Sequence, residues 1–163
     1  MFWEPLGLII VIGGLVWHDI VLIDASLDFD DDPEVVWKRV SDVEKIPEYW
    51  RGTKSLRVLE RVDGDKLIAA VKFAFGGWGK AEITTDAAAK TLLLRYVSGP
   101  FTGTQTVRVV GKRLEAKWDI NFHGIFRIGS GRTAAHFKGG TVHALERLAE
   151  ISEANLPEQR SRG

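Results

Sequence analysis

The stretch DPEVVWKRVSDVEKIPEYW, residues 32–50, carries the strongest local structural signals in this chain. Asp32 has the short, oxygen-bearing side chain preferred at a helix N-cap, and Pro33 suits the first helical position. Apolar residues then recur at helical spacing and form one stripe: Val36, Trp37 and Val40. The stretch therefore predicts a short amphipathic helix. A second helical turn is expected over residues 43–49, where Pro47 limits its regularity.

Strand-like segments flank this helical region on both sides. Between Asp19 and Phe29 the odd positions from Val21 onward are apolar and the even positions from Asp24 onward are polar, which predicts a half-buried strand. After Gly52 the chain is a series of further strand-like runs, separated by short turns rich in Gly, Asp and Pro. Such short links make consecutive strands antiparallel. The expected strands span residues 53–63, 66–75, 78–85, 91–98, 101–110 and 113–122.

A long helix is expected over residues 133–155, because apolar or small residues recur there at spacings of three and four. Gly139 and Gly140 interrupt this pattern and cost on the order of 1 kcal/mol each relative to alanine. Two small residues at this point allow a close approach by another group or a bend in the helix. The residues of the inward stripe are Phe137, Thr141, Leu145, Leu148 and Ser152.

Together these elements predict an α+β domain whose curved antiparallel sheet has one apolar face and one substantial helix to cover it. A single helix with small residues such as Ala134 and Ala144 does not fill the concavity, so we expect a hollow between sheet and helix. The expected organisation is an apolar N-terminal segment over residues 1–18, one ligand-binding domain over residues 19–156 and a polar tail over residues 157–163.

The order of elements and the residues of the helical region resemble the SRPBCC superfamily, also called START-like or helix-grip proteins. The most specific residues are those from Asp32 to Asp42, followed by Ile46-Pro47-Glu48-Tyr49-Trp50. This superfamily includes the birch-pollen allergen, polyketide cyclase/dehydrase-like proteins and coenzyme-Q-binding proteins. The resemblance covers residues 19–155 and implies about seven strands wrapped around the long C-terminal helix. It also implies a cavity for apolar ligands, whereas the functions of members range from lipid carriage to cyclisation.

Composition excludes several kinds of chemistry. The chain has 163 residues, with 22 Lys and Arg against 22 Asp and Glu, so it has no surplus charge for broad nucleic-acid binding. It contains no Cys, which excludes disulfides, thiolate zinc sites and cysteine nucleophiles. We expect no cofactor. The scarcity of Asn, Gln, Cys and Met is typical of proteins from hot environments, a hypothesis about origin that a melting experiment would test.

The four His residues do not form a recognisable metal site. His136 and His143 are seven positions apart, which separates them by about 10 Å along a helix and differs from the i, i+4 spacing typical of metal ligands. His123 is expected at an exposed strand end, and His18 belongs to the apolar start. No metal is therefore expected.

Polar residues at inward positions are the best candidates for ligand contacts. Gln105 lies among apolar neighbours, so its amide either bonds within the protein or waits for a ligand carbonyl or hydroxyl. Tyr96 lies on the same face of its expected strand as the inward-facing residues, and its hydroxyl is a candidate anchor for the polar head of a ligand. By resemblance, the loop at Trp50-Arg51 and the segment containing Phe126-Arg127 border the cavity mouth. The expected cavity residues are Trp50, Val71, Phe73, Phe75, Tyr96, Gln105, Trp118, Phe126, Phe137, Gly140, Thr141 and Leu145.

Three functions remain open from the sequence. The first is non-enzymatic binding or transport of a hydrophobic small molecule such as a lipid, quinone, isoprenoid or polyketide-like compound. The second is a cyclase- or hydrolase-type enzyme in the same cavity, with Tyr96 or, after a register shift, Asp119 as acid or base. The third is an interaction module that uses the apolar start to dimerise or to dock on a membrane protein.

The apolar start itself, LGLIIVIGGLVW at residues 6–17, is too short for a membrane span of ~20 residues and lacks the basic flank of a secretory signal. It packs on its own domain or on a second subunit, forms a peripheral membrane contact, or reflects a start codon upstream of the natural one. We expect the protein to be cytoplasmic, with membrane association through residues 1–17 as an open alternative.

Overall fold

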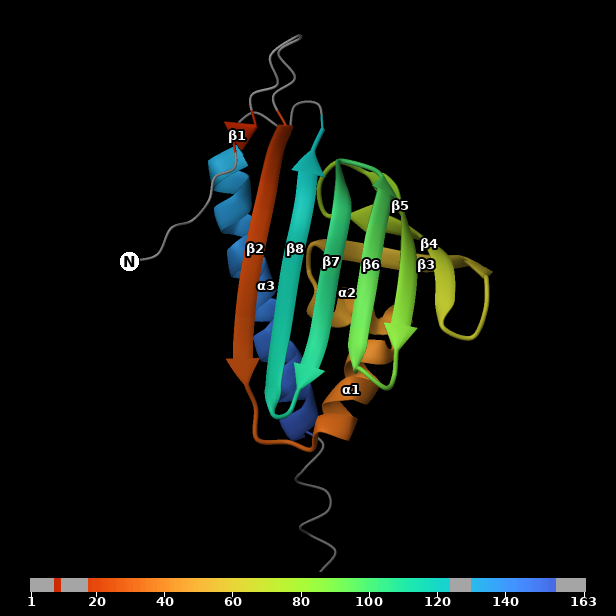
Figure 1. Cartoon of the computed structure of the whole chain (residues 1–163), viewed down its shortest axis with the longest axis vertical. Helices are drawn as coiled ribbons and strands as arrows, with labels where there is room; N and C mark the ends of the chain where they lie inside the picture. The colour runs from red at the N-terminus through yellow and green to blue at the C-terminus, as the bar shows by residue number, and fades with distance from the viewer. Residues whose placement is uncertain (1–7, 10–17, 124–129, 155–163) are drawn as a thin grey trace, which may run out of the picture.

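The computed structural model describes residues 8–9, 18–123 and 130–154, with side chains over residues 20–123 and 135–150 (Figure 1). Antiparallel strands form one sheet in the order β1-β2-β8-β7-β6-β5-β4-β3, so β2 from the start of the chain pairs with the last strand. The elements are β1 (Leu8–Ile9), β2 (His18–Asp28), α1 (Pro33–Ser41), the 3-10 turn η1 (Val43–Lys45), α2 (Ile46–Tyr49), β3 (Thr53–Arg61), β4 (Lys66–Phe73), β5 (Trp78–Asp86), β6 (Thr91–Ser98), β7 (Phe101–Val110), β8 (Arg113–Phe122) and α3 (Ser130–Ala154).

The long helix α3 lies against one face of the sheet. It contacts β2 and β8 directly and touches α1 and α2 at its C-terminal half (Figure 1). Register shifts in β3 near Ser55 and Glu60, and between Lys80 and Ala81 in β5, mark irregularities of the kind that bend strands and increase twist. The α+β, helix-grip architecture expected from the sequence is therefore confirmed.

The helical region after β2 forms as its residues predict. The Asp32 side chain accepts a hydrogen bond of 2.9 Å from the Glu34 backbone N–H, and Pro33 occupies the first helical position of α1. The predicted apolar stripe is buried, with Trp37 only 7% exposed. The second helical turn divides into η1 and α2, with Pro47 in the first turn of α2.

Strand boundaries agree closely with the alternation of the sequence. The three expected strands over residues 91–98, 101–110 and 113–122 are observed with those bounds. The strand expected over residues 66–75 ends earlier, at Phe73. The Phe73 N–H donates to the Gly77 carbonyl, and this bond closes a turn. The C-terminal helix begins at Ser130 rather than at residue 133.

Only two residues of the apolar start are described. They form β1, in which Leu8 pairs with Asp19 and Ile9 with His18, so this part of the start extends the sheet of its own chain. The remaining residues of the start, and with them the expected dimer or membrane contact, lie outside the described residues. Among the described helices, none is both long enough and apolar enough to cross a bilayer.

The space between sheet and helix is filled largely by aromatic side chains. Phe101 is fully buried, and its ring centroid lies 5.0 Å from that of Phe73, 4.9 Å from that of Tyr96 and 5.5 Å from that of Phe137. The expected hollow is therefore occupied at its centre by rings from β4, β6, β7 and α3. Open space remains to one side of this aromatic core.

Candidate functional site

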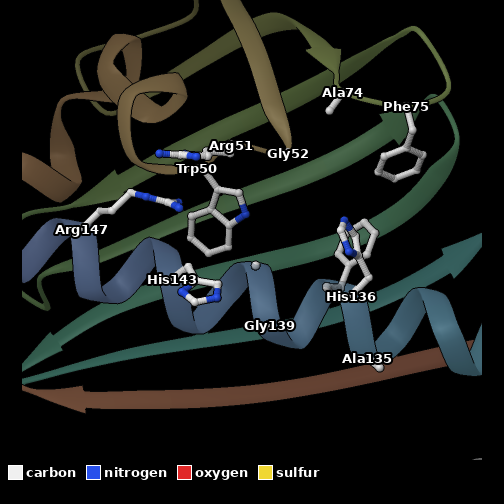
Figure 2. Close-up of a pocket in the computed structure, with 12 residues that line it drawn as sticks. Trp50, Arg51, Gly52, Ala74, Phe75, Ala135, His136, Gly139, His143 and Arg147 are labelled. Atoms are coloured by element: carbon white, nitrogen blue, oxygen red, sulfur yellow. The ribbon is translucent and has the colours of Figure 1, made fainter.

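A pocket lined by residues of α3 and two loops has a volume of about 530 Å³. It lies between α3 and two loops, one after α2 and one after β4 (Figure 2). Its lining consists of Trp50, Arg51, Gly52, Ala74, Phe75, Ala135, His136, Phe137, Gly139, Gly140, His143 and Arg147.

Trp50 forms one wall of this pocket and is held in place by the backbone. Its N–H donates to the Ile46 carbonyl at 2.8 Å, and its carbonyl accepts from the Thr53 N–H at 3.0 Å. The indole is 6% exposed and meets the Trp118 ring edge-on at 5.5 Å between centroids. A fixed aromatic face of this kind offers apolar contact area without a further loss of side-chain entropy.

The other end of the pocket is also aromatic. Phe75 and Phe137 meet in a T-shaped contact, with 5.7 Å between ring centroids and 82° between ring planes. The Ala74 N–H donates to the Gly52 carbonyl at 2.9 Å, which ties the loop after β4 to the loop after α2. Both pocket loops are therefore connected to each other as well as to the sheet.

The floor of the pocket is the exposed, small-residue face of α3. Gly139 and Gly140 line it, and a Cβ atom built on either glycine would meet nothing within 4 Å. Close helix packing therefore does not require these glycines, although each costs on the order of 1 kcal/mol relative to alanine. Their effect in the structure is to leave space above the helix.

Four ionisable side chains of the pocket are basic or imidazole groups: Arg51, His136, His143 and Arg147. Arg147 donates from Nη1 to the Tyr49 carbonyl at 3.1 Å, which fixes its position beside Trp50. The Nδ1 atom of His143 lies 3.3 Å from Oε2 of the exposed Glu146. None of the described lining residues is an Asp or a Glu.

The residues expected to contact ligand are distributed between this pocket and the core. Trp50, Phe75, Phe137 and Gly140 line the pocket. A second cavity of about 20 Å³ adjoins the core and is lined in part by Phe73 and Trp118. Phe126 lies outside the described residues. The remaining expected residues are buried in the core and do not line the 530 Å³ pocket: Val71, Tyr96, Gln105, Thr141 and Leu145.

The buried polar side chains of this core are hydrogen-bonded within the protein. The Tyr96 hydroxyl donates to Oε1 of Gln105 at 2.8 Å, so the bond that the Gln105 carbonyl needs comes from the chain itself. The Trp118 indole N–H donates to Oγ1 of Thr141 at 3.0 Å, and that hydroxyl donates in turn to the Phe137 carbonyl at 2.7 Å. These bonds stabilise the contact between α3 and the sheet.

Acid–base chemistry by the two groups considered from the sequence is not favoured by their positions. Burial raises the pKa of Tyr96 well above its ordinary value, so its phenol stays protonated at neutral pH. Asp119 is exposed on the outer face of the sheet, because the register of β8 places Trp118 and Ile120 inward. Neither group lines the 530 Å³ pocket.

The two tyrosines predict a loss of stability in alkali. Burial raises the pKa of both Tyr49 and Tyr96, and in Tyr49 the charge of Asp42 adds to the effect. Above pH ~10 the unfolded chain loses these protons while the folded chain keeps them, so stability is complete below that pH and falls above it. Above that pH each tyrosine lowers the free energy of unfolding by about 1.4 kcal/mol per pH unit. Tyrosinate absorbance should therefore appear together with loss of circular dichroism.

The Tyr96→Phe variant is the control for this alkaline transition. It should halve the tyrosine contribution to the slope of the free energy of unfolding against pH. At neutral pH it should lower the free energy of unfolding by about 1 kcal/mol, because the Gln105 carbonyl loses its donor. Gradual appearance of tyrosinate in the folded protein at pH ~10, before any unfolding, would show that the two phenols are not protected.

Sequence reasoning missed several pocket residues. His136, Gly139, His143 and Arg147 lie on the helix face next to the apolar stripe, at spacings of three and four that could have grouped them. Over the described ranges, 18–123 and 130–154, no group of three His, Asp or Glu residues is arranged to hold a metal ion.

Comparison with known proteins places this geometry in a family. Residues 31–127 match the family model described as polyketide cyclase/dehydrase and lipid transport. No curated protein sequence matches the chain.

Solved structures share the fold at low sequence identity. The Zhui aromatase/cyclase from Streptomyces sp. R1128 has a TM-score of 0.64 and 14% identity, over 82% of this chain and 94% of that one. The protein TTHA0849 from Thermus thermophilus has a TM-score of 0.65 and 16% identity, over 83% and 99% of the two chains. The ginseng major latex-like protein 151 from Panax ginseng has a TM-score of 0.60 and 13% identity, over 85% and 99%.

Proposed function

Because the chain belongs to the polyketide cyclase/dehydrase and lipid transport family, we propose that it binds a hydrophobic small molecule in the pocket between α3 and the loops after α2 and β4. The ligand class is a lipid, quinone, isoprenoid or polyketide-like compound. The apolar part of the ligand lies between Trp50 at one end and Phe75 and Phe137 at the other.

The observation that carries this proposal is the pocket itself. Its volume of about 530 Å³ falls within the range of small-molecule sites, ~300–1,000 Å³. Aromatic side chains form much of the pocket wall. Burial of apolar ligand surface against such a wall contributes ~25 cal/mol per Å² to the binding free energy. Together with a family that includes lipid-transport proteins, this supports a binding role.

The direct test is native mass spectrometry of the full chain with a panel containing a fatty acid, a polyprenol, a quinone and an aromatic polyketide. We expect retention of at least one class at a one-to-one ratio, and release of the same compound by organic extraction of protein from its native source. Binding should be unchanged in Trp78→Ala, which removes an indole that is 54% exposed and outside the pocket. Failure to retain any of the four classes would contradict the proposal.

A cyclase- or hydrolase-type enzyme is the second candidate, because His136 and His143 both line the pocket. An imidazole can donate or accept a proton near neutral pH. The two candidates differ in what is recovered after incubation. A carrier returns the added polyketide-like compound unchanged, whereas an enzyme returns a product whose formation requires one of these histidines.

A further inference from the structure

The charge around the pocket is one-sided. The whole chain is balanced, with 22 basic and 22 acidic residues, yet the described lining contains two arginines and two histidines without a carboxylate. The arginines are Arg51 in the loop after α2 and Arg147 on α3. The charged side chains of the described lining are therefore basic, although the chain as a whole is balanced.

Neither guanidinium forms an ion pair with a carboxylate of the described residues. Arg147 gives one N–H to the Tyr49 carbonyl, which leaves four of its five donors for other partners. No Asp or Glu among the described residues lies within ion-pair distance of Arg51 or Arg147. Other surface arginines do have such partners, since Arg61 pairs with Glu44 at 3.4 Å and Arg113 with Asp28 at 3.0 Å.

The two arginines lie at one end of the apolar pocket. Figure 2 shows Arg147 extending from α3 toward Trp50 and Arg51 beside that indole, with Phe75 at the opposite end. Arg147 is half-buried, so water screens its charge less than that of a fully exposed side chain. The pocket therefore has an apolar body with a positively charged end.

We infer that the ligand of this pocket is an amphipathic anion, with its negative head at Arg51 and Arg147 and its apolar body between Trp50 and Phe75. This inference rests on the proposed function and names the ligand class within it. Guanidinium groups present paired N–H donors that match a carboxylate, a sulfate or a phosphate. A carboxylate on a long apolar chain is the simplest probe of this chemistry.

The experiment compares three probes with the same apolar chain on the full-length protein: dodecanoate, dodecanol and dodecylammonium. Isothermal titration calorimetry should show dodecanoate binding at least about tenfold more tightly than dodecanol, and dodecylammonium more weakly than either. Added salt should weaken the binding of dodecanoate and leave that of dodecanol nearly unchanged.

Variants assign the preference to the two arginines. Arg51→Gln and Arg147→Gln should each reduce dodecanoate affinity about tenfold and change dodecanol affinity less than about twofold. Arg147→Lys retains the positive charge and a donor for the Tyr49 carbonyl, so it should lose less dodecanoate affinity than Arg147→Gln. This variant keeps the test usable if Arg147→Gln folds poorly. Arg108→Gln is the matched control, because Arg108 is exposed on β7 and does not line the pocket.

The outcomes separate this inference from the proposed function. Equal affinity for dodecanoate and dodecanol, unaffected by Arg51→Gln and Arg147→Gln, would overturn the anionic head and leave a hydrophobic ligand in place. Tighter binding of dodecylammonium would overturn it in the same way. If none of the three probes or the four ligand classes binds, the proposed function fails and the inference fails with it.

Discussion

Replacing Gly140 by tryptophan is expected to reduce ligand affinity about a hundredfold while leaving the fold intact. A Cβ atom on Gly140 meets nothing within 4 Å, so a large side chain at this position extends into the pocket rather than into the protein. Displacing about 100 Å² of apolar ligand surface costs about 2.5 kcal/mol, which corresponds to nearly two orders of magnitude in affinity. Calorimetry with the best-binding member of the ligand panel measures this loss.

Two variants separate steric exclusion from general effects on α3. Gly140→Ala should raise the free energy of unfolding by about 1 kcal/mol, because alanine favours the helix, and should change affinity little. Val142→Trp places the same bulk on an exposed position of α3 that does not line the pocket, and should leave binding unchanged. If Gly140→Trp binds ligand as well as the unmodified chain, the ligand does not occupy the space above this helix.

Replacing Gly103 by alanine is expected to destabilise the fold by about 4 kcal/mol or more, a large share of the 5–15 kcal/mol typical of a domain. Its φ angle of +127° is one that residues with a side chain rarely adopt. A Cβ atom there would lie 2.1 Å from the Asp119 carbonyl oxygen and 2.8 Å from the Cα atom of Ile120. Relief would require β7 and β8 to separate at the centre of the sheet, which urea unfolding would detect.

Gly111→Ala is the matched control for the backbone part of this effect. Gly111 also has a positive φ angle, +56°, but a Cβ atom on it would meet nothing within 4 Å. Its substitution should therefore cost only about 1 kcal/mol, the penalty for the left-handed conformation. Equal losses in the two variants would show that contact with β8 is unimportant.

Much of the fold could be predicted because its signals are local. Alternation of apolar and polar residues defined β6, β7 and β8 to the residue, and Asp32-Pro33 predicted the start of α1. In one place where a prediction differed, a backbone contact absent from the alternation explains the difference. It is the early end of β4 at Phe73, caused by its hydrogen bond to Gly77.

The candidate site was harder to predict, because alternation reveals the face on which a residue lies but not whether facing side chains meet. Tyr96 and Gln105 were correctly expected to face inward, yet they bond to each other at 2.8 Å within the core. The lining of the pocket comes instead from loops and from the margin of α3, where His143 and Arg147 lie. Helical spacing groups these two residues with each other, but no local pattern predicts that they meet the loops after α2 and β4.

The hydrogen bonds that Tyr96, Trp118 and Thr141 make inside the core have a consequence for selectivity. The Tyr96 hydroxyl and the Trp118 indole N–H already have acceptors, and the Thr141 hydroxyl both donates and accepts. A ligand that approaches these three groups therefore meets no free hydrogen-bond donor among them. Near these groups the apolar portion is therefore selected by its length and shape rather than by hydrogen bonds, so compounds that share a head group should differ in affinity when their tails differ in geometry.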